Sequence, residues 1–312
     1  MADILMTGAA GFLGSHFADG LLADGHRVVG VDNMITGATP NLAHLSNEPR
    51  FTLVERDIND GLEFPGRLDY VVNLASLASP VDYSEHPLET LMVGALGSRH
   101  CLELAREKKA VYFFSSTSEV YGDPLVSPQP ESYWGNVNPT GVRSCYDESK
   151  RFGEALTAAY QRAGLVDART ARIFNTFGPR MRRNDGRAVP NFIVQALKGE
   201  PITVYGDGSQ TRSFCYVDDL IDGLTRLLFS DVTTPVNIGN PNEMTILEMA
   251  KLIKGTIGSK SEITFKPLPG DDPKQRRPDI TLARERLGFE PKWPLKDGLL
   301  KTIEFFAKNQ GN

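Results

Sequence analysis

A tyrosine and a lysine four residues apart carry the clearest chemistry in this sequence. Tyr146 and Lys150 lie in the stretch Tyr-Asp-Glu-Ser-Lys, and side chains at i and i+4 are neighbours on one face of a helix. A free phenol titrates near pH ~10, but a fixed ammonium group and an oxidised nicotinamide cation would lower its pKa. The pair is therefore predicted to take a proton from a sugar hydroxyl while a hydride leaves for a bound dinucleotide. The same spacing also occurs on ordinary helix surfaces, so the prediction depends on the segments around it.

A glycine-rich turn near the N-terminus predicts the dinucleotide site that this chemistry needs. Gly8, Gly11 and Gly14 follow the first apolar segment and precede a helical pattern. Gly8 permits a tight turn, Gly11 lets a pyrophosphate approach the backbone, and Gly14 lets the helix pack on the strand. Asp32 ends the second predicted strand, where a carboxylate binds an adenosine ribose and disfavours a 2′-phosphate. The pattern predicts NAD rather than NADP, and the simpler alternative for Asp32 is a turn residue.

Polar side chains follow three further predicted strands. Residues 73–76 lie at the end of one strand, at a place where the cofactor must pass, since ligands lie at the C-terminal edge of such sheets. Asp57 follows another strand and is predicted either to contact adenine or to cap a turn. Ser115, Thr117 and Glu119 share one face if the extended conformation of their strand continues. The two hydroxyls are predicted to hold the reacting sugar hydroxyl near Tyr146. Glu119 is predicted to serve as a second acid–base group, with a pKa that would rise if it were buried beside the substrate; the alternative for the whole stretch is a solvated turn.

The elements that must position these residues follow an alternating pattern, which predicts an α/β fold with a doubly wound parallel sheet of the Rossmann type. The predicted strands are residues 4–7, 27–32, 51–55, 70–74, 111–115 and 168–173, and the predicted helices are 12–24, 88–108, 146–163 and 295–308. A smaller C-terminal substrate-binding lobe is expected, with a long ordered loop over 266–278. The NAD-binding domain is predicted to span 1–175 with return segments near 214–241, and the lobe to span 176–213 and 242–312.

Composition narrows the class of protein. A net charge of −5 over 312 residues argues against nonspecific nucleic-acid binding. No apolar run approaches the ~20 residues of a membrane helix, so neither nucleic acid nor membrane is an expected partner. The three cysteines form no CxxC pair and favour a reducing cytoplasm. Cys145 has no histidine near it in sequence and is a poor candidate nucleophile. The five histidines show no ligand spacing, so no metal is expected.

The order of the glycine turn, the acidic strand end, the Ser/Thr strand end and YxxxK resembles the extended short-chain dehydrogenase/reductases. Four segments resemble, more narrowly, the UDP-glucuronic acid decarboxylases, also called UDP-xylose synthases. They are STSEVYGDP at 116–124, YWGNVNP at 133–139, ARIFNTFGPRM at 171–181 and DDPKQRRPD at 271–279. The resemblance implies a cytosolic NAD enzyme that oxidises C4 of UDP-glucuronate, loses CO2 from the β-keto acid and reduces the 4-keto pentose to UDP-xylose. It also implies a homodimer built from helices near 90–107 and 147–163.

The resemblance assigns roles to individual residues. Tyr146 is the base, Lys150 assists it, Thr117 binds the C4 region, Glu119 takes part in acid–base steps around decarboxylation, and Arg276 lies beside the substrate. The expected cofactor site comprises Gly8, Gly11, Phe12, Leu13, Asp32, Asn33, Thr36, Gly37, Asp57, Ile58, Leu74, Ser76, Ser115, Tyr146 and Lys150. The expected substrate site comprises Asn175, Tyr205, Arg212 and Arg276, where Tyr205 either packs near uracil or belongs to the core. Because the protein is acidic and the substrate is anionic, local arginines must capture it; Arg180, Arg182, Arg183, Arg187 and Arg277 are weaker candidates.

One segment departs from the superfamily pattern. The usual N-x-x-G-[ST] reads Gly94-Ala-Leu-Gly97-Ser98 here, and Met92 replaces a commonly basic residue. The missing asparagine weakens the expectation of a water-linked proton path through the lysine, and Met92 weakens the expectation of substrate contacts on this helix. Two alternatives remain open at this point. One is a UDP-uronate 4-epimerase or a related sugar-nucleotide dehydratase, and the other is a non-catalytic NAD-binding module, which often lacks the tyrosine or the lysine.

Overall fold

Seven parallel strands form the central sheet of the computed structural model, which describes residues 1–268, 270 and 273–309. The strands are β1 (Asp3–Thr7), β2 (Arg27–Asp32), β3 (Phe51–Glu55), β4 (Tyr70–Asn73), β5 (Val111–Thr117), β6 (Ala168–Ile173) and β11 (Val236–Ile238). Their order is β11-β6-β5-β4-β1-β2-β3, so the order reverses between β1 and β4, where ligands of such sheets bind. The predicted doubly wound Rossmann-type fold is confirmed.

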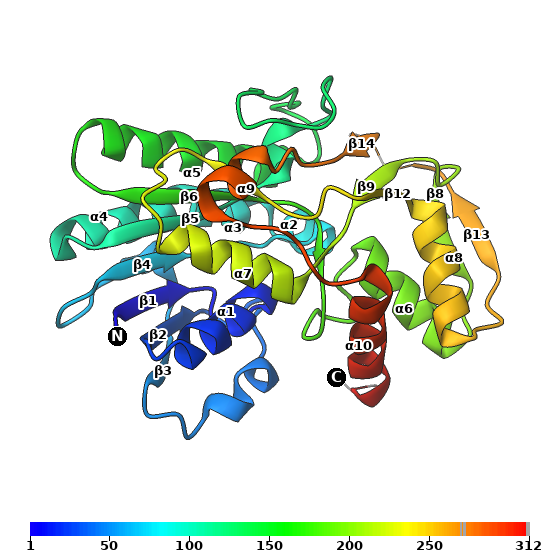
Figure 1. The fold of residues 1–312 in the computed structure, drawn as a ribbon, viewed down its shortest axis with the longest axis horizontal. Coiled ribbons are helices and arrows are strands. Elements are labelled where there is room, and N and C mark those ends of the chain that lie inside the picture. The colour runs from blue at the N-terminus through cyan, green and yellow to red at the C-terminus, as the bar shows by residue number, and fades with distance from the viewer. Residues whose placement is uncertain (269, 271–272, 310–312) are drawn as a thin grey trace.

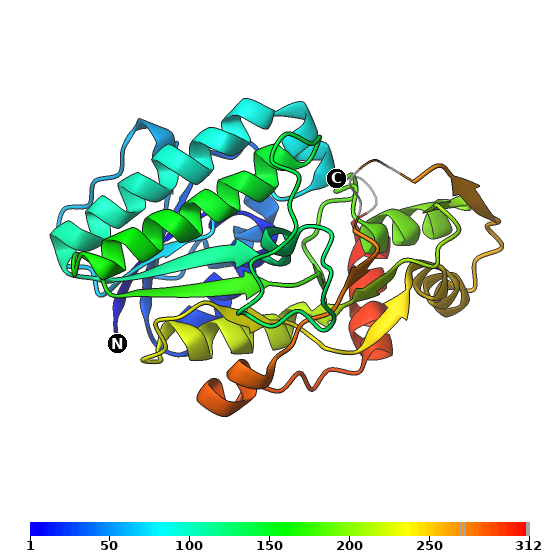
Figure 2. The same ribbon diagram turned by 90° about the horizontal axis from the view of Figure 1, so that it is seen from above.

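Helices cover both faces of this sheet (Figures 1 and 2). One face carries α3 (Pro87–Met92), α4 (Ser98–Lys108) and α5 (Ser144–Arg162), and the other carries α1 (Phe12–Ala23) and α7 (Val217–Leu228). Successive strand residues point to opposite faces, so Leu5 belongs to one core cluster whereas Ile4 and Met6 belong to the other. Burying each such side chain contributes roughly 1.5–3 kcal/mol. Both faces are therefore apolar, which explains the continuous apolar strands of the sequence.

The long helix predicted over 88–108 is interrupted in the structure. A π-helical turn, Val93–Gly97, separates α3 from α4. Gly94 packs so closely on α5 that an added Cβ would lie 2.5 Å from the Cβ of Ser149. Wider π-helical turns inside helices are often found at functional sites. The helical pattern predicted the helix but gave no sign of the interruption, because that depends on a neighbour about fifty residues away.

The smaller lobe is built from short strands and helices (Figure 1). Its helices are α6 (Ala188–Lys198), α8 (Ile246–Ile257) and α10 (Leu295–Lys308), and its strands are β8 (Ile202–Tyr205), β9 (Thr211–Ser213), β12 (Glu243–Thr245), β13 (Ile263–Lys266) and β14 (Gln275–Arg276). β9 pairs with both β12 and β14, and β8 pairs with β13. The loop predicted over 266–278 thus contains a short strand, β14, and its residues 269 and 271–272 lie outside the described residues. Short β7 (Thr176–Phe177) and β10 (Cys215–Tyr216) pair with each other. Helix α2 (Pro80–Glu85) contacts α3, and α9 (Thr281–Leu287) contacts α7 and β11.

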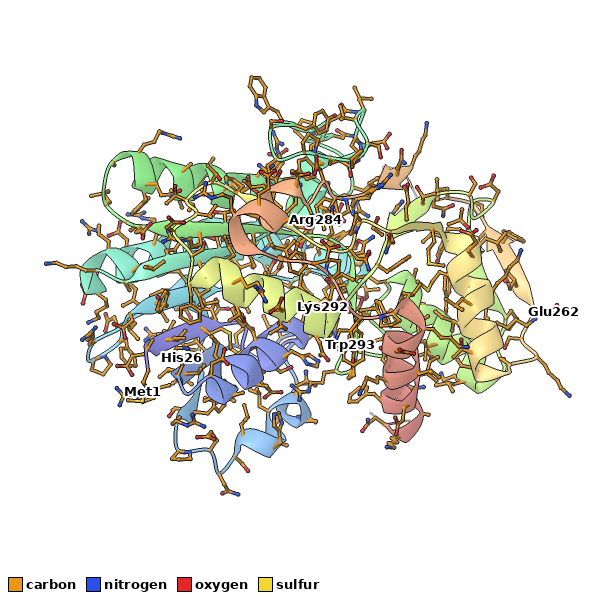
Figure 3. All side chains as sticks on the ribbon, viewed as in Figure 1. Met1, His26, Glu262, Arg284, Lys292 and Trp293 are labelled. Atoms are coloured by element: carbon orange, nitrogen blue, oxygen red, sulfur yellow. The ribbon has the colours of Figure 1, made fainter. Side chains whose placement is uncertain are left out.

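Buried contacts join α7 to the segment before α10. The Asp219 carboxylate accepts hydrogen bonds from the backbone N–H groups of Lys292 and Trp293, both at 2.9 Å. The Trp293 ring packs 4.7 Å from that of Tyr216, centroid to centroid, and Figure 3 labels both Lys292 and Trp293 at this junction. The C-terminal helix is therefore fixed against the sheet domain. Among the described residues no helix is both long and apolar enough to cross a bilayer.

Candidate active site

One cavity of about 810 Å³ is lined both by the glycine turn and by residues of the smaller lobe. Its volume is in the usual range for small-molecule sites. Of the residues predicted for the cofactor, catalytic and substrate sites, all except Gly37 line it. These predicted residues come from the ends of β1, β2, β3, β4, β5 and β6, from α5, and from the small-lobe strands. The structure thus brings the predicted site residues together, while their individual roles remain predictions.

The glycine turn at one end of the cavity fits a pyrophosphate. Gly8 has φ +71°, a left-handed conformation that favours glycine. A Cβ on Gly14 would lie 2.0 Å from the Gly8 carbonyl oxygen, so only glycine allows α1 to start this close to the turn. Phe12 and Leu13 open α1 and line the cavity, and backbone N–H groups in a first helical turn lack helical acceptors and favour anions. The residues present therefore fit an NAD pyrophosphate.

Asp32 is held in place at the end of β2. Its Oδ2 accepts from the Ala10 N–H and its Oδ1 accepts from the Met34 N–H, both at 2.9 Å. Burial raises the pKa of Asp32 despite these two bonds. Gly37 does not line the cavity but packs on this carboxylate, since a Cβ there would lie 2.6 Å from Oδ1. The fixed carboxylate is placed to accept ribose hydroxyl donors, as NAD requires.

Asp57 caps a turn, as one of its two predicted alternatives stated. Its Oδ1 accepts from the Asn59 N–H at 2.8 Å, at the start of a 3-10 turn, Ile58–Asp60. Its Oδ2 accepts from the Asn33 side chain at 3.0 Å. Asp57, Asn33 and Ile58 all line the cavity, so a contact with adenine remains a prediction for this cluster.

Tyr146 and Lys150 lie one turn apart on α5, as their spacing predicted. Both are buried, and the Lys150 Nζ lies 5.9 Å from the centroid of the Tyr146 ring. Nζ donates a 2.9 Å hydrogen bond to the Ser115 carbonyl oxygen at the end of β5. The Ser115 hydroxyl in turn donates to the Asn73 carbonyl oxygen at 2.9 Å. Lys150 is thereby fixed to the ends of two neighbouring strands, β5 and β4.

Among the protein's own groups, burial has the largest effect on the pKa of Tyr146. Burial raises the pKa of Tyr146 to about 12, against an opposing effect of the Thr117 side chain. Burial also lowers the pKa of Lys150 to about 7. Both shifts have one cause, since each group loses water that would stabilise its charged form. A phenolate at neutral pH therefore requires a cation in addition to this lysine.

Glu119 differs from its prediction in two ways. β5 ends at Thr117, and the chain turns into a 3-10 helix, Ser118–Tyr121, because the Thr117 Oγ1 accepts from the Glu119 N–H at 3.3 Å. The extended conformation therefore does not continue to Glu119. Burial would raise the pKa of Glu119, but Arg276 and Arg143 outweigh it and hold that pKa well below its usual range. Arg276 binds the carboxylate with two hydrogen bonds, Nη1 to Oε1 at 2.5 Å and Nη2 to Oε2 at 2.6 Å.

The departure at Gly94 has a packing consequence. A side chain at this position would meet the Ser149 Cβ at 2.5 Å and the Ser149 carbonyl oxygen at 2.9 Å. An asparagine cannot fit there unless α5 moves away. Met92 is 46% exposed and does not line the cavity. Neither residue contributes a side chain to the site, and close helix contact replaces the usual asparagine.

Several residues that line the cavity were missed or given little weight in the sequence. Arg143 donates to Glu119 at 2.8 Å, and Tyr83 stacks on Tyr146 with ring centroids 5.4 Å apart. Arg182 pairs with Asp82, and Arg187 pairs with Asp185 at 2.5 Å. Arg143 precedes Tyr146 by one helical turn, and this spacing could have identified it as a site residue from the sequence. No neighbouring sequence pattern identifies Tyr83 as a site residue.

The remaining arginine and tyrosine candidates for the substrate site differ in whether they line the cavity. Arg183 donates to the Phe306 carbonyl oxygen at 2.8 Å and Arg277 to that of Pro241 at 3.1 Å, so both have structural contacts outside the cavity. Arg212 is buried and lines the cavity. Tyr205 is 42% exposed, which excludes the alternative that it is a core residue. Among the described residues no three His, Cys, Asp or Glu side chains gather as a metal site.

Comparison with known proteins agrees with this geometry. Residues 4–239 match the NAD dependent epimerase/dehydratase family. The chain is 52% identical to UDP-glucuronic acid decarboxylase 1 of Danio rerio over 305 residues, which cover 98% of this chain and 72% of the relative. Among solved structures, a Thermotoga maritima UDP-glucose 4-epimerase with UDP-glucose superposes with a TM-score of 0.90 at 30% identity, covering 99% of each chain. A Bacillus cereus UDP-glucuronic acid 4-epimerase in complex with UDP-glucuronic acid and NAD gives a TM-score of 0.84 at 28% identity, covering 98% of this chain and 99% of that one.

Proposed function

The chain belongs to the NAD dependent epimerase/dehydratase family, and we propose that within it the protein is a UDP-glucuronic acid decarboxylase that forms UDP-xylose and CO2. Its identity with a curated decarboxylase is 52%, whereas its identity with the two 4-epimerases compared above is 28% and 30%. The observation that carries the proposal is one cavity that joins a dinucleotide-binding turn, a Tyr146–Lys150 pair and an Arg276–Glu119 pair. The first two features suit every member of the family, and the third suits an anionic sugar.

In this proposal the cofactor and the residues around the sugar have different roles in the reaction. NAD, when bound, accepts a hydride from C4 of the sugar and later returns it. Tyr146 takes the proton of the C4 hydroxyl, and Thr117, whose side chain opposes the rise in the pKa of the phenol, orients that hydroxyl. Lys150, fixed by the Ser115 carbonyl, supplies a nearby ammonium group when the phenolate forms. A ketone at C4 makes the C5 carboxylate a β-keto acid, which loses CO2.

Glu119 and Arg276 serve the carbon-loss step in this proposal. Glu119 is ionised, because two guanidinium groups lower its pKa, so it has no proton of its own to give. It accepts a hydrogen bond from a water molecule, and that water supplies the proton that C5 takes up after the C–CO2 bond breaks and leaves an enolate. Arg276 is buried and holds the Glu119 carboxylate in a fixed orientation. A group held in place by a bidentate arginine is well suited to move a proton at one defined atom.

Arg212, Asn175 and Tyr205 are proposed to bind the uridine diphosphate half. Arg212 comes from β9 and Asn175 follows β6, so the two approach the cavity from different lobes. The proposed domains follow this division, with a cofactor domain over 1–175 and 214–241 and a substrate lobe over 176–213 and 242–312. A diphosphate bound across the two lobes would also hold them together.

A homodimer is proposed through the helices on one face of the sheet. Four large apolar side chains are exposed there, at 69% for Leu88, 46% for Met92, 40% for Leu96 and 50% for Phe152. Exposed apolar groups concentrated on neighbouring helices favour a protein–protein contact. Light scattering of the purified protein tests it, and a monomer at micromolar concentration would contradict it.

A cytoplasmic location is proposed from cysteine chemistry. Cys101, Cys145 and Cys215 are all free and buried, and free thiols persist in reducing compartments. Cell fractionation with an antibody to the protein tests this proposal, and recovery from an oxidising compartment would contradict it.

Product analysis tests the activity. Incubation with UDP-glucuronate and NAD is expected to release one CO2 for each UDP-pentose formed. UDP-galacturonate without CO2 would instead identify a 4-epimerase. The Tyr146→Phe variant is the matched control, since it keeps the ring packing against Tyr83 and removes only the hydroxyl; it is expected to bind NAD but not to turn over.

A further inference from the structure

Gln129 is a fully buried glutamine that lies outside the cavity and uses each of its polar groups. It is 0% exposed and does not line the cavity. Its side-chain Oε1 accepts from the Arg277 N–H at 2.8 Å, and its Nε2 donates to the Val126 carbonyl oxygen at 2.6 Å. Its backbone N–H donates to the Arg277 carbonyl oxygen at 2.9 Å, and its carbonyl oxygen accepts from the Asp279 N–H at 3.0 Å. Burying an amide is costly unless such bonds satisfy it, and these bonds hold residues 277–279.

The same contacts fix the backbone next to Arg276. Arg277 directly follows Arg276, and Gln129 binds both its N–H and its carbonyl oxygen. On the other side of Arg276, the Lys274 N–H donates to the Asp123 Oδ1 at 3.0 Å. The strand β14 itself is only two residues long and pairs with β9. Asp123 and Gln129 therefore hold the chain before and after Arg276.

The position of this backbone determines where the guanidinium group lies. Arg276 is 157 residues from Glu119 in sequence, so no local geometry brings the two together. Its two hydrogen bonds to the Glu119 carboxylate, at 2.5 and 2.6 Å, require two nitrogen atoms to be in place at once. The Arg276 side chain is 3% exposed, so water does not replace a bond that is lost. In an active site, a displacement of about 1 Å lowers a rate by about 10²-fold.

We propose that Gln129 is a positioning residue for the reaction, which fixes the backbone beside Arg276 and so holds the guanidinium group on the Glu119 carboxylate. The inference rests on the proposed function, because that function assigns Glu119 a part in the chemistry. Gln129 acts through Arg276 and not through a ligand, since it does not line the cavity. Asp123 has the same effect more weakly, because it is partly exposed and accepts one hydrogen bond from this segment.

A double-mutant cycle tests the proposal. Gln129→Met keeps a side chain of similar length and removes both side-chain hydrogen bonds. Consumption of UDP-glucuronate, with NAD in excess, is measured by NMR for wild type, Gln129→Met, Glu119→Gln and the double variant. We expect Gln129→Met to lower kcat on the order of 10²-fold in the wild-type background, with an NAD dissociation constant within about two-fold of wild type. In the Glu119→Gln background it should cost less than about two-fold, because the interaction that it supports is already lost.

The same loss in both backgrounds would overturn the proposal, since a purely structural role acts whether or not the Glu119 carboxylate is present. A kcat of Gln129→Met equal to that of wild type would overturn it too. Asp123→Ala is a second variant that decides the matter if Gln129→Met fails to fold; it should lower kcat in the wild-type background only. Gln161→Met is the matched control, because its carboxamide donates to two carbonyl oxygens and it does not line the cavity; its kcat should equal that of wild type.

Hydrogen–deuterium exchange of the NAD-loaded protein separates this proposal from the proposed function. The N–H groups of Arg277 and Asp279 donate to Gln129, so the peptide that contains them should exchange faster in Gln129→Met than in wild type. Unchanged exchange would overturn the proposal, whatever product the protein forms. UDP-galacturonate formed by the wild-type protein without CO2 would instead refute the proposed function, while the exchange rates still report whether Gln129 holds the chain beside Arg276.

Discussion

Replacing Lys150 by methionine should stabilise the fold at neutral and acidic pH. Lys150 is buried, and burial lowers its pKa from the ordinary 10.5 to about 7. At roughly 1.4 kcal/mol for each pKa unit, this corresponds to an upper limit of about 5 kcal/mol of unfolding free energy. Methionine fills a similar volume and has no charge to bury, but it leaves the Ser115 carbonyl oxygen without its 2.9 Å donor, which costs about 1–3 kcal/mol.

The sign of the effect depends on pH in a defined way. Below about pH 7 lysine is protonated in both the folded and unfolded chain, so the full cost of burying its charge is present. Between about pH 7 and 10.5 the unfolded chain binds more protons than the folded one, so the stability contributed by this group rises with pH. The advantage of Lys150→Met should therefore be about 2–4 kcal/mol near pH 6.5. This stability advantage should fall by at most about 1.4 kcal/mol for each pH unit above 7. It should change sign at the pH where the cost of the lost hydrogen bond exceeds the remaining cost of burying the lysine charge.

Urea unfolding of both proteins without dinucleotide, at several values between about pH 6.5 and 9.5, measures this difference. Lys251→Met is the matched control, since it makes the same substitution at an exposed lysine of α8 and should give a small difference at every pH. A difference between Lys150→Met and wild type that stays constant from about pH 7 to 9.5 would refute the reasoning that burial lowers this pKa.

Three other substitutions give sharp outcomes. Gly94→Ala places a Cβ 2.5 Å from that of Ser149 and should lower stability by about 1–3 kcal/mol, read as a fall in Tm; a Tm equal to wild type would contradict the close packing. Glu119→Gln leaves Arg276 buried without its carboxylate, so we expect a loss of about 3 kcal/mol and a kcat at least ~100-fold lower, and normal turnover would exclude Glu119 from the chemistry. Phe152→Glu puts a charge on a ring that is 50% exposed and should yield monomers by light scattering; an unchanged dimer would place the interface elsewhere.

Much of the fold could be predicted because its signals are local. The apolar strands and the glycine turn at Gly8 depend on backbone geometry and burial within a few residues, and they appear where predicted. The interruption of the helix at Val93–Gly97 could not be predicted, because it depends on how closely Gly94 meets Ser149 across two helices. The strand β14 likewise exists only through its pairing with β9.

The positions of the site residues could be predicted better than their electrostatics. The ends of parallel strands meet at one edge of a sheet, which brought Asp32 and Ser115 to one cavity. The direction of a pKa shift depends instead on every neighbour of a group. Glu119 was expected to have a raised pKa, and two arginines far from it in sequence reverse the direction. The lowered pKa expected for Tyr146 includes the charge of an oxidised nicotinamide, whereas burial among the protein's own groups raises that pKa.

The product formed from UDP-glucuronate in D2O tests most directly the claim that Tyr146 and Glu119 serve one oxidation, carbon loss and reduction in a single site. NMR is expected to show UDP-xylose that carries one deuterium at C5, from a solvent-exchangeable donor, and protium at C4, from a hydride that never leaves the protein. UDP-galacturonate with its carboxylate intact, or a pentose with deuterium at C4, would contradict the claim.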